Sequence, residues 1–289
     1  MADLSLIVVT HNTRDETRGC LESLPDEACE VIVVDSGSSD GTVAMLRDEF
    51  PQARSIELDN VGFGRSVNVA MRLVSSDYVA VCNADVRWRS ASLHQLADAL
   101  VSDKTIGLIG PQVLFPSGRR QASARALPTV PTAIGHALLR RIAPRNRWTR
   151  RYHATAASDT ARDVDWLSGC AFVVRRVAFE QVGGFDPGFF LYVEDVDLAR
   201  RLRAAGWRVY YLPGARVTHR AGASTAAHAV RARFVHARSL ARYARKYHRS
   251  ALARVTRPML WLGLAGWVAV DIIVHRLRPG QSTTAEVSN

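Results

Sequence analysis

The chain has 289 residues, 47% of them hydrophobic, so it can bury the core of one large domain or of a domain with an appendage. Its four cysteines are scattered without the paired spacing of a zinc site, which argues against a cysteine-ligated metal centre. The net charge of +11 indicates an anionic partner, and nucleic acid, acidic lipid headgroups and a phosphorylated substrate all fit it.

Up to about residue 115, short apolar segments alternate with amphipathic ones. The apolar segments have the length and β-branched content of buried strands, and the amphipathic segments have the period of helices. This alternation is typical of βαβ units and predicts a mostly parallel sheet with helices on both faces. The expected strands are 4–10, 30–35, 77–82 and 106–114, and the expected helices are 13–24, 42–50, 65–74 and 90–101.

Two carboxylates follow predicted strands. Asp35 ends one strand and opens the turn-rich segment 36–42, and Asp85 comes shortly after another strand. Ligands of an open parallel sheet bind beyond the carboxyl ends of its strands. Asp35 is therefore suited to accept a hydrogen bond from a nucleotide base or ribose, and Asp85 is suited to hold a divalent cation against a diphosphate. A polar residue that only ends a strand and opens a turn is the common alternative.

The third expected helix begins after a short segment that contains glycine. The sequence has no P-loop, and the Gly-x-Gly at 62–64 is weak evidence for phosphate binding on its own. Four residues of this segment and helix are candidates for lining the pocket of a nucleotide donor: Asn60, Gly62, Arg65 and Asn68. The alternative is an ordinary helix start with Asn60 as its cap.

Residues 116–163 are rich in Arg, Ala and Pro and have little periodicity. We interpret them as an excursion from the sheet on the acceptor side, partly helical near 132–142. Strands are expected again at 169–175 and 208–212.

Three carboxylates, Glu194, Asp195 and Asp197, begin the helix expected at 194–205. They follow the loop 183–193, which carries four aromatic residues and three glycines. Carboxylates in a first turn often complement the helix dipole as caps, but one cap would suffice. A cluster of acids beside an aromatic loop indicates instead a general base at the edge of a pocket.

The C-terminal tail has the pattern of a membrane-associating segment. Apolar residues recur every three or four positions over 229–255 and basic residues fill much of the remainder, which predicts a basic amphipathic helix. The apolar run 258–274 is barely long enough to span a bilayer and contains Asp271, so we expect it to lie at the interface with Trp261 and Trp267 at headgroup depth. The alternative for this run is a helix that packs on the catalytic domain or on a dimer partner.

An ordered set of motifs between residues 4 and 224 resembles the family-2 glycosyltransferases of the GT-A fold. Each motif is weak alone, but their order and spacing are specific. Two segments of the middle region, 123–128 and 144–149, narrow the resemblance to bacterial rhamnosyltransferases that extend a polyprenyl-diphosphate-linked N-acetylglucosamine in cell-wall linker assembly. The matching motifs are VVTHN at 8–12, VVDSGSSDGT at 33–42, NVGF at 60–63, NADV at 83–86, WLSG at 166–169 and the whole block 183–198.

This resemblance implies an α/β catalytic domain of GT-A fold over 1–224, built on a Rossmann-like mixed sheet with helices on both faces, and a helical tail over 225–289. It implies an inverting glycosyltransferase that moves L-rhamnose from dTDP-L-rhamnose to a polyprenyl-diphosphate-linked sugar. The enzyme would act at the cytoplasmic face of the cell membrane, against an anionic lipid surface.

The resemblance also implies roles for individual residues. Asp195 matches the catalytic base, which takes the proton of the attacking alcohol. Asp85 and His219 match the residues that hold Mg²⁺ or Mn²⁺, but Asn83 replaces the first acid of the family's Asp-x-Asp motif with a weaker, neutral ligand. The expected donor-site residues are Thr10, Asn12, Asp35, Asn60, Gly62, Asn68, Asn83 and Asp85, and the expected supporting residues of the base are Glu194, Asp197, Trp166 and Gly169.

Other functions stay open at this point. The same fold could use a UDP-hexose or GDP-mannose donor, and the protein could form a homodimer. A nucleic-acid-binding protein would suit the charge, but the basic segment leads directly into a Trp-bearing apolar run and the acids cluster at strand ends. A non-catalytic binding protein would suit Asn83, but the intact Glu194–Asp195 pair argues against it.

Overall fold

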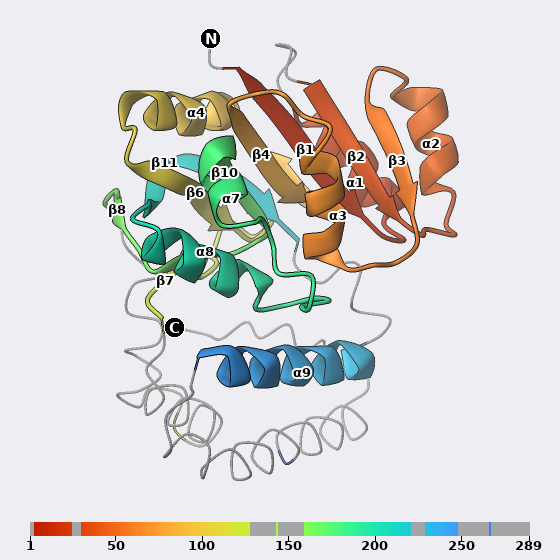
Figure 1. Ribbon diagram of the computed structural model, residues 1–289. Helices are drawn as coiled ribbons and strands as arrows, with labels where there is room; N and C mark the ends of the chain where they lie inside the picture. The colour runs from red at the N-terminus through yellow and green to blue at the C-terminus, as the bar shows by residue number, and fades with distance from the viewer. Residues whose placement is uncertain are drawn as a thin grey trace.

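A nine-stranded mixed sheet forms the centre of the structure (Figure 1). The structure is a computed structural model that describes residues 3–24, 30–127, 143, 159–220, 229–247 and 266. The strands are β1 Leu4–Thr10, β2 Glu30–Ser36, β3 Arg54–Leu58, β4 Tyr78–Asn83, β5 Val86–Trp88, β6 Ile106–Leu114, β7 Ala124–Arg125, β8 Arg162–Asp163, β9 Trp166–Leu167, β10 Ala171–Arg175 and β11 Arg208–His219.

The spatial order of the sheet is β3-β2-β1-β4-β10-β6-β11-β5, with β8 paired to β11 and with β7 and β9 forming a separate pair. The first four of these strands are parallel to one another, and so are β6 and β11. β10 enters antiparallel between β4 and β6, and β5 pairs antiparallel with β11. Because β10 is antiparallel to both of its neighbours, β6 and β11 point the same way as β4, and only β10, β5 and β8 run against the other six strands. The sheet is therefore mixed but mostly parallel, as the sequence predicts.

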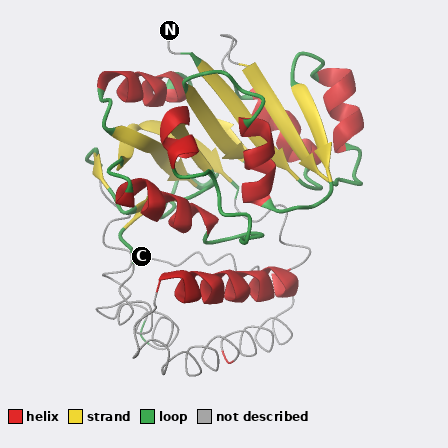
Figure 2. Ribbon diagram, in the orientation of Figure 1, coloured by secondary structure: helices red, strands yellow, loops and turns green. Residues whose placement is uncertain are grey.

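Helices cover both faces of the sheet, as the sequence predicts (Figure 2). Residues of α1, α2 and α4 share one buried cluster, and residues of α3, α7 and α8 share the other. Leu6 and Val8 of β1 point into the first cluster and Ile7 into the second, which is the alternation of a strand buried on both faces. The helices are α1 Arg14–Glu22, α2 Thr42–Glu49, α3 Phe63–Met71, α4 Ser92–Ser102, α7 Arg176–Gln181, α8 Glu194–Ala204 and α9 Ala229–Tyr247.

Most predicted elements are confirmed, with differences at their ends. β11 continues to His219, beyond the predicted end at 212, because it crosses a register shift between Leu212 and Arg216 and then pairs with β5. β3, β5 and α7 were not predicted. β3 lies at the sheet edge with no fully buried side chain, so it lacks the apolar run that marks the other strands.

The described residues include only some of the helical segments predicted after residue 115. α9 confirms the first part of the helix predicted at 229–255. The helix predicted near 132–142 and the apolar run 258–274, except Gly266, lie outside the described residues. Of the helices that the structure describes, none combines the length and the apolar content needed to cross a membrane.

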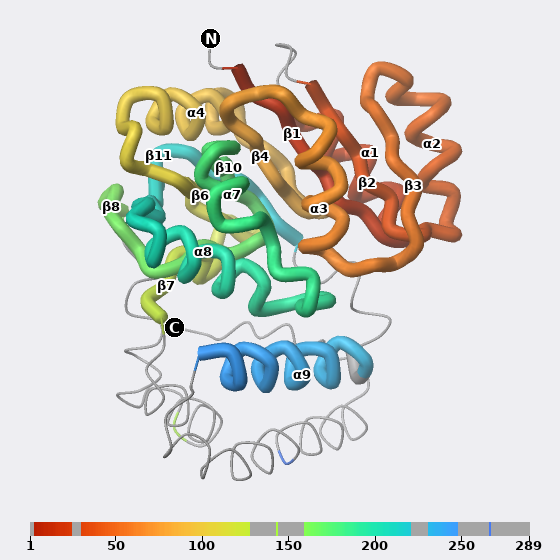
Figure 3. Tube along the Cα trace, in the orientation of Figure 1, coloured from red at the N-terminus to blue at the C-terminus, as the bar shows by residue number. Residues whose placement is uncertain are grey.

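One side of α9 packs against the catalytic domain. In Figures 1 and 3 the helix runs below α8 and below the loop that joins α7 to α8. Ser239 is buried, and its hydroxyl donates to the Leu191 carbonyl in that loop (2.8 Å). The helix predicted to face lipid therefore also faces the block 183–198.

Candidate active site

The carboxyl ends of β1, β2 and β4 bring three predicted donor-site residues to one edge of the sheet. Thr10 is the register partner of Asp35, and Asn83 is the partner of Val9 on the other side of β1. Open α/β sheets bind their ligands at this edge. Residues from three distant parts of the sequence therefore meet where a donor nucleotide is expected.

Asn12 ties together the turns that follow β1 and β2. Its backbone N–H donates to the Ser38 hydroxyl (2.8 Å), and its side-chain Oδ1 accepts from the Ser39 N–H (2.7 Å). Its φ of 51° lies in the left-handed region, which asparagine tolerates. Thr10 is buried, with its hydroxyl 2.7 Å from that of Thr17. Both residues therefore fix the shape of this edge.

Asp35 presents an unused acceptor at the same edge. The residue is 2% exposed, and its Oδ2 accepts from the Ser38 N–H (2.9 Å). Its Oδ1 is buried and has no hydrogen-bond partner within the described part of the chain. A buried carboxylate oxygen without a donor is costly, so this atom is suited to accept a hydrogen bond from a base N–H or a ribose hydroxyl.

Asn60 and Gly62 border the edge from the side of β3. The Asn60 Nδ2 lies 3.2 Å from the His11 Nε2. Gly62 has a φ of 89°, and a Cβ at this position would lie 2.1 Å from the Phe190 carbonyl oxygen. Only glycine therefore lets the loop before α8 approach the start of α3 so closely.

Asn68 serves a different purpose from the predicted one. Its Nδ2 donates to the Phe185 carbonyl (2.8 Å) and its Oδ1 accepts from the Phe185 N–H (2.9 Å). Both polar groups of the amide thus hold the loop after Gly184 against α3. Asn68 was predicted to line the donor pocket, but the structure directs its side chain to the loop that leads to Asp195.

Asp85 and His219 meet where β11 pairs with β5, since His219 is the register partner of Val86. The His219 Nε2 lies 3.2 Å from the Asp85 Oδ1. Gln121 holds the imidazole from its other side, because its Oε1 lies 2.9 Å from Nδ1 and its Nε2 donates to the His219 carbonyl (2.6 Å). Sequence reasoning missed Gln121, which lies in the excursion 116–163 where no periodic pattern marks it.

The geometry of this pair fits a divalent cation. Two cis ligands of an octahedral site lie about 3 Å apart when each is ~2.1 Å from the metal, and the Asp85–His219 separation is 3.2 Å. A hydrogen bond at Nδ1 leaves Nε2 as the ligating atom. No third His, Cys, Asp or Glu completes a cluster among the described residues, so donor diphosphate oxygens and water would fill the other positions.

The metal-free form of the pair holds a proton. Burial by itself would lower the pKa of His219, but the neighbouring Cys170 and Asp85 groups raise it to about 10. The imidazole is then charged and shares its proton with the Asp85 carboxylate. A ligating imidazole must be neutral, so a bound cation would replace this proton.

A backbone bond at Asn83 joins the strand ends to the base. The Asn83 N–H donates to the Cys170 carbonyl (2.9 Å), and the preceding Gly169 N–H donates to the Asp195 Oδ2 (2.9 Å). The segment Gly169–Cys170 therefore lies between β4 and the start of α8. It brings Asp195 to the edge where Asp85 lies, and the Gly169 N–H contacts the candidate base directly.

Asp195 is half-buried at the start of α8, with Oδ1 accepting from the Val196 N–H (2.8 Å). Burial raises the pKa of its carboxyl, although the N–H groups of Gly169 and Val196 and the charge of Arg125 act in the opposite direction. A general base works best with a pKa near the operating pH. The environment of Asp195 shifts its carboxyl toward that range.

Glu194 is buried beside Asp195, and its Oε2 has no hydrogen-bond partner within the described ranges. Burial and the neighbouring Asp195 raise the pKa of Glu194 to about 8. The buried Glu194 carboxyl therefore ionises less readily than an exposed glutamate.

Asp197 was predicted to support the base, and its side chain contacts α8 and α9 rather than Asp195 directly. It is fully buried, and its two oxygens accept from Arg201 Nε (2.8 Å), Lys246 Nζ (2.7 Å) and the Tyr247 hydroxyl (2.7 Å). Two of these donors belong to α9, which the sequence pattern gave no reason to place there. Trp166 is also buried; its indole N–H donates to the Ala126 carbonyl (3.3 Å).

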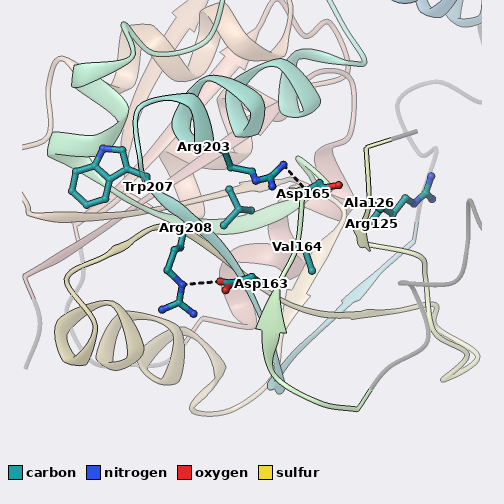
Figure 4. A pocket seen from close by; sticks show the side chains of 9 residues that line it. Arg125, Ala126, Asp163, Val164, Asp165, Arg203, Trp207 and Arg208 are labelled. Atoms are coloured by element: carbon teal, nitrogen blue, oxygen red, sulfur yellow. Dashed lines mark hydrogen bonds and ion pairs between the residues drawn. The ribbon is translucent and has the colours of Figure 1, made fainter. Parts of the chain in front are cut away.

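A pocket of about 360 Å³ lies near the other end of α8 (Figure 4). Its acids are already paired, Asp165 with Arg203 (2.7 Å) and Asp163 with Arg208 (2.8 Å). None of its lining residues is a predicted site residue. The pocket is therefore separate from the edge that carries Asp35, Asp85 and Asp195.

A buried carboxylate oxygen without a donor, an Asp–His pair and a half-buried carboxylate at one edge of a mixed α/β sheet are the groups that a nucleotide-sugar transferase requires. The comparisons with known proteins agree. Residues 5–183 match the model of glycosyl transferase family 2, and residues 149–222 match that of the N-terminal domain of galactosyltransferase. The chain belongs to glycosyl transferase family 2 and is a glycosyltransferase.

Two curated relatives are rhamnosyltransferases. The chain is 36% identical over 237 residues to N-acetylglucosaminyl-diphospho-decaprenol L-rhamnosyltransferase of Mycobacterium tuberculosis, covering 77% of each chain. It is 29% identical to rhamnosyltransferase WbbL of Escherichia coli, covering 74% of this chain and 82% of the relative. The similarity thus extends over most of the length of both proteins.

Solved structures share the fold. Mannosyltransferase PcManGT of Pyrobaculum calidifontis, in complex with GDP-Man and Mn²⁺, superposes with a TM-score of 0.58 at 18% identity, over 94% of this chain and 75% of that protein. TarS of S. aureus gives a TM-score of 0.55 at 14% identity, over 98% of this chain and 76% of that protein. The GT-A-type α/β fold predicted from the motifs is confirmed.

Proposed function

We propose that this glycosyltransferase moves L-rhamnose from dTDP-L-rhamnose to a polyprenyl-diphosphate-linked N-acetylglucosamine, with inversion at the anomeric carbon. The observation that carries the proposal is the 36% identity, over 77% of both chains, to an enzyme named for rhamnosyl transfer to a decaprenyl-diphosphate-linked acceptor. The placement of the candidate base and of the candidate metal ligands at one sheet edge supports the same reaction type.

Each residue has a part in this reaction. Asp35 Oδ1 accepts a hydrogen bond from the donor nucleotide, and Asn12 keeps the two flanking turns in place. Asp195 accepts the proton of the acceptor hydroxyl as that oxygen attacks the anomeric carbon. The bond to the nucleoside diphosphate breaks as the new bond forms, so a single displacement inverts the centre without a second carboxylate nucleophile.

Asp85 and His219 would hold the divalent cation, and Gln121 would orient the imidazole. A bound cation supplies charge neutralisation on the diphosphate leaving group. The donor set of one carboxylate and one imidazole is softer than the all-oxygen set that suits Mg²⁺, which favours Mn²⁺ between the two predicted ions. Asn83, half-exposed at the end of β4, supplies at most a neutral amide.

The donor assignment predicts a clear preference in a substrate screen. With the polyprenyl-diphosphate N-acetylglucosamine acceptor and Mn²⁺ present, the enzyme should release the nucleoside diphosphate dTDP rapidly from dTDP-L-rhamnose. The product should carry the inverted α-linkage, which NMR of the disaccharide would show. Transfer from UDP-glucose or GDP-mannose with none from dTDP-L-rhamnose would overturn the donor assignment and leave the glycosyltransferase family unchanged.

We also propose that the enzyme works at the cytoplasmic surface of the membrane, because its proposed acceptor is anchored in lipid. The side of α9 away from the catalytic domain exposes Arg231, Phe234 and Arg238, with Phe234 55% exposed. Basic side chains near an anionic bilayer contribute about 1 kcal/mol each, and an exposed aromatic ring adds apolar insertion.

The full-length protein should therefore bind vesicles that contain anionic lipid, with less binding as salt rises. The variant Arg231→Ser/Phe234→Ser/Arg238→Ser should bind several-fold less in a co-sedimentation assay while keeping its far-UV circular dichroism. A wild-type protein that ignores anionic vesicles at low salt would contradict the proposal, and a concentration-dependent dimer in the same experiment would assign this face to a second copy of the chain.

A further inference from the structure

The fully buried Asp197 carboxylate is the centre of a charge network that spans two distant parts of the chain. A buried charge requires donors, and removing one leaves it uncompensated. Arg201 lies on the same helix, but Lys246 and Tyr247 come from the end of α9. Burial and the Asp197 carboxylate raise the pKa of Tyr247, so its hydroxyl stays protonated and donates.

The backbone just before the base is strained. Tyr192 and Val193 have φ values of 67° and 70°, a left-handed conformation that is unfavourable for bulky and β-branched residues. Such a pair persists only where the surroundings enforce it. Val193 then accepts the first helical hydrogen bond of α8, from the Asp197 N–H (3.0 Å). The strained pair thus sets the direction in which α8 presents Asp195.

α9 holds both flanks of this strained pair. Before it, the Ser239 hydroxyl donates to the Leu191 carbonyl, and the His236 ring lies 5.0 Å from the Tyr192 ring. After it, α9 reaches Asp197 by the two bonds described above. The helix therefore contacts the segment 191–197 on either side of the two residues with positive φ.

A single ammonium group links this region to the aromatic loop. Lys246 Nζ lies 2.7 Å from an oxygen of Asp197 and 2.7 Å from an oxygen of Asp186, and Arg242 pairs with the same Asp186 (2.8 Å). Although burial acts in the other direction, Lys246, the Gly188 N–H and Arg242 lower the pKa of Asp186 to about 2. Both ends of the segment 186–197 are therefore fixed to α9 by charge.

We infer that Lys246 and Tyr247 are positioning residues for catalysis, which act through Asp197 to hold Asp195 at the acceptor hydroxyl. The inference rests on the proposed role of Asp195 as the base. It makes the C-terminal helix part of the active site rather than an accessory to it. The donor-site residues at the strand ends, Thr10, Asp35 and Asn83, belong to β1, β2 and β4 and take no part in these contacts.

The test compares saturating kcat with donor KM in the full-length protein. Tyr247→Phe and Lys246→Met should each lower kcat by about 10- to 100-fold, because a displacement of 1 Å at a reacting group costs that much, while donor KM stays within about twofold. Lys246→Arg should recover much of the loss. Lys104→Met, at an exposed lysine between α4 and β6, is the matched control and should keep its kcat.

Two further measurements separate positioning from a general loss of folding. Tyr247→Phe removes one hydroxyl and keeps the ring that packs on Arg200 and Tyr243, so thermal unfolding should stay cooperative at a lowered Tm, with the variant folded at the assay temperature. Hydrogen exchange of the amides at 194–197 should nevertheless become faster. In the Asp197→Asn background, Tyr247→Phe should have little further effect on kcat, because the Tyr247 hydroxyl acts through Asp197.

Unchanged kcat in Lys246→Met and Tyr247→Phe would overturn the inference, and so would equal and additive losses in the Asp197→Asn background. Asp195→Asn, measured in the same assay, distinguishes a failure of the positioning role of α9 from a failure of Asp195 as the base. Full activity of Asp195→Asn would refute the base itself, whatever the α9 variants do. A large loss in Asp195→Asn with wild-type kcat in the α9 variants would refute only the role of α9.

Discussion

Replacing Asp195 with Asn is expected to lower kcat by about 10²-fold or more, since general-base catalysis typically contributes 10²–10⁴-fold. Asparagine keeps the size of the side chain and can still accept from the Gly169 N–H, so folding and donor binding should be preserved. The measurement is kcat and donor KM with saturating acceptor, together with donor affinity by calorimetry. KM should change little, because the base acts on the acceptor proton.

The pH dependence gives the same residue a second test. Burial raises the pKa of Asp195, and a base must be deprotonated to act. Activity should therefore rise with pH through a pKa above the ordinary aspartate range, and this rise should be absent in Asp195→Asn. Asp163→Asn, a carboxylate paired with Arg208 away from the site, is the control and should keep the wild-type profile. Near-normal kcat in Asp195→Asn would place the base elsewhere.

Removing the cation site should abolish transfer. Asp85→Ala and His219→Ala each delete one of the two ligands, and neither leaves enough protein donors to hold an ion against the diphosphate. Excess EDTA should likewise stop the wild-type enzyme, and added Mn²⁺ should restore it. Binding of Mn²⁺ in the presence of donor nucleotide, followed by electron paramagnetic resonance, should weaken in both variants.

A change at Gln121 should have a smaller effect on the same metal site. Its hydrogen bond orients His219 without touching the ion, so Gln121→Ala should weaken Mn²⁺ binding by about 10- to 100-fold while high Mn²⁺ restores activity. Full wild-type activity in EDTA would instead show that the replacement of an acid by Asn83 marks a metal-independent site.

Sequence patterns predicted the residues at strand ends well. The polar residue that ends a strand is recognisable because the apolar run stops there. Asp35 and Asp85 could thus be placed at the ends of predicted strands from their local patterns alone. His219 required more, because the apolar pattern of β11 ends at Leu212 and the strand resumes beyond a register shift. Only the family motif indicated it.

Residues whose roles depend on long-range packing were the ones that pattern reasoning missed or misplaced. Gln121 has no periodic context, and it reaches His219 across 98 positions of sequence. Asn68 has the helical spacing of a pocket residue, yet its amide is used by Phe185. The antiparallel insertion of β10 has the same cause, since an apolar run shows that a strand is buried and does not show its direction.

The contacts of Asp197 limit where this chain can be truncated. A cut near residue 224, where the composition changes, would remove two of the three donors to a fully buried carboxylate. Breaking a buried ion pair in this way costs about 3–5 kcal/mol, a large share of the 5–15 kcal/mol that typically holds a domain folded. The transferase part is therefore not a portable module. Shortened versions, and chimaeras that exchange the tail between related enzymes, should carry Lys246 and Tyr247 with them or replace Asp197 by a neutral residue.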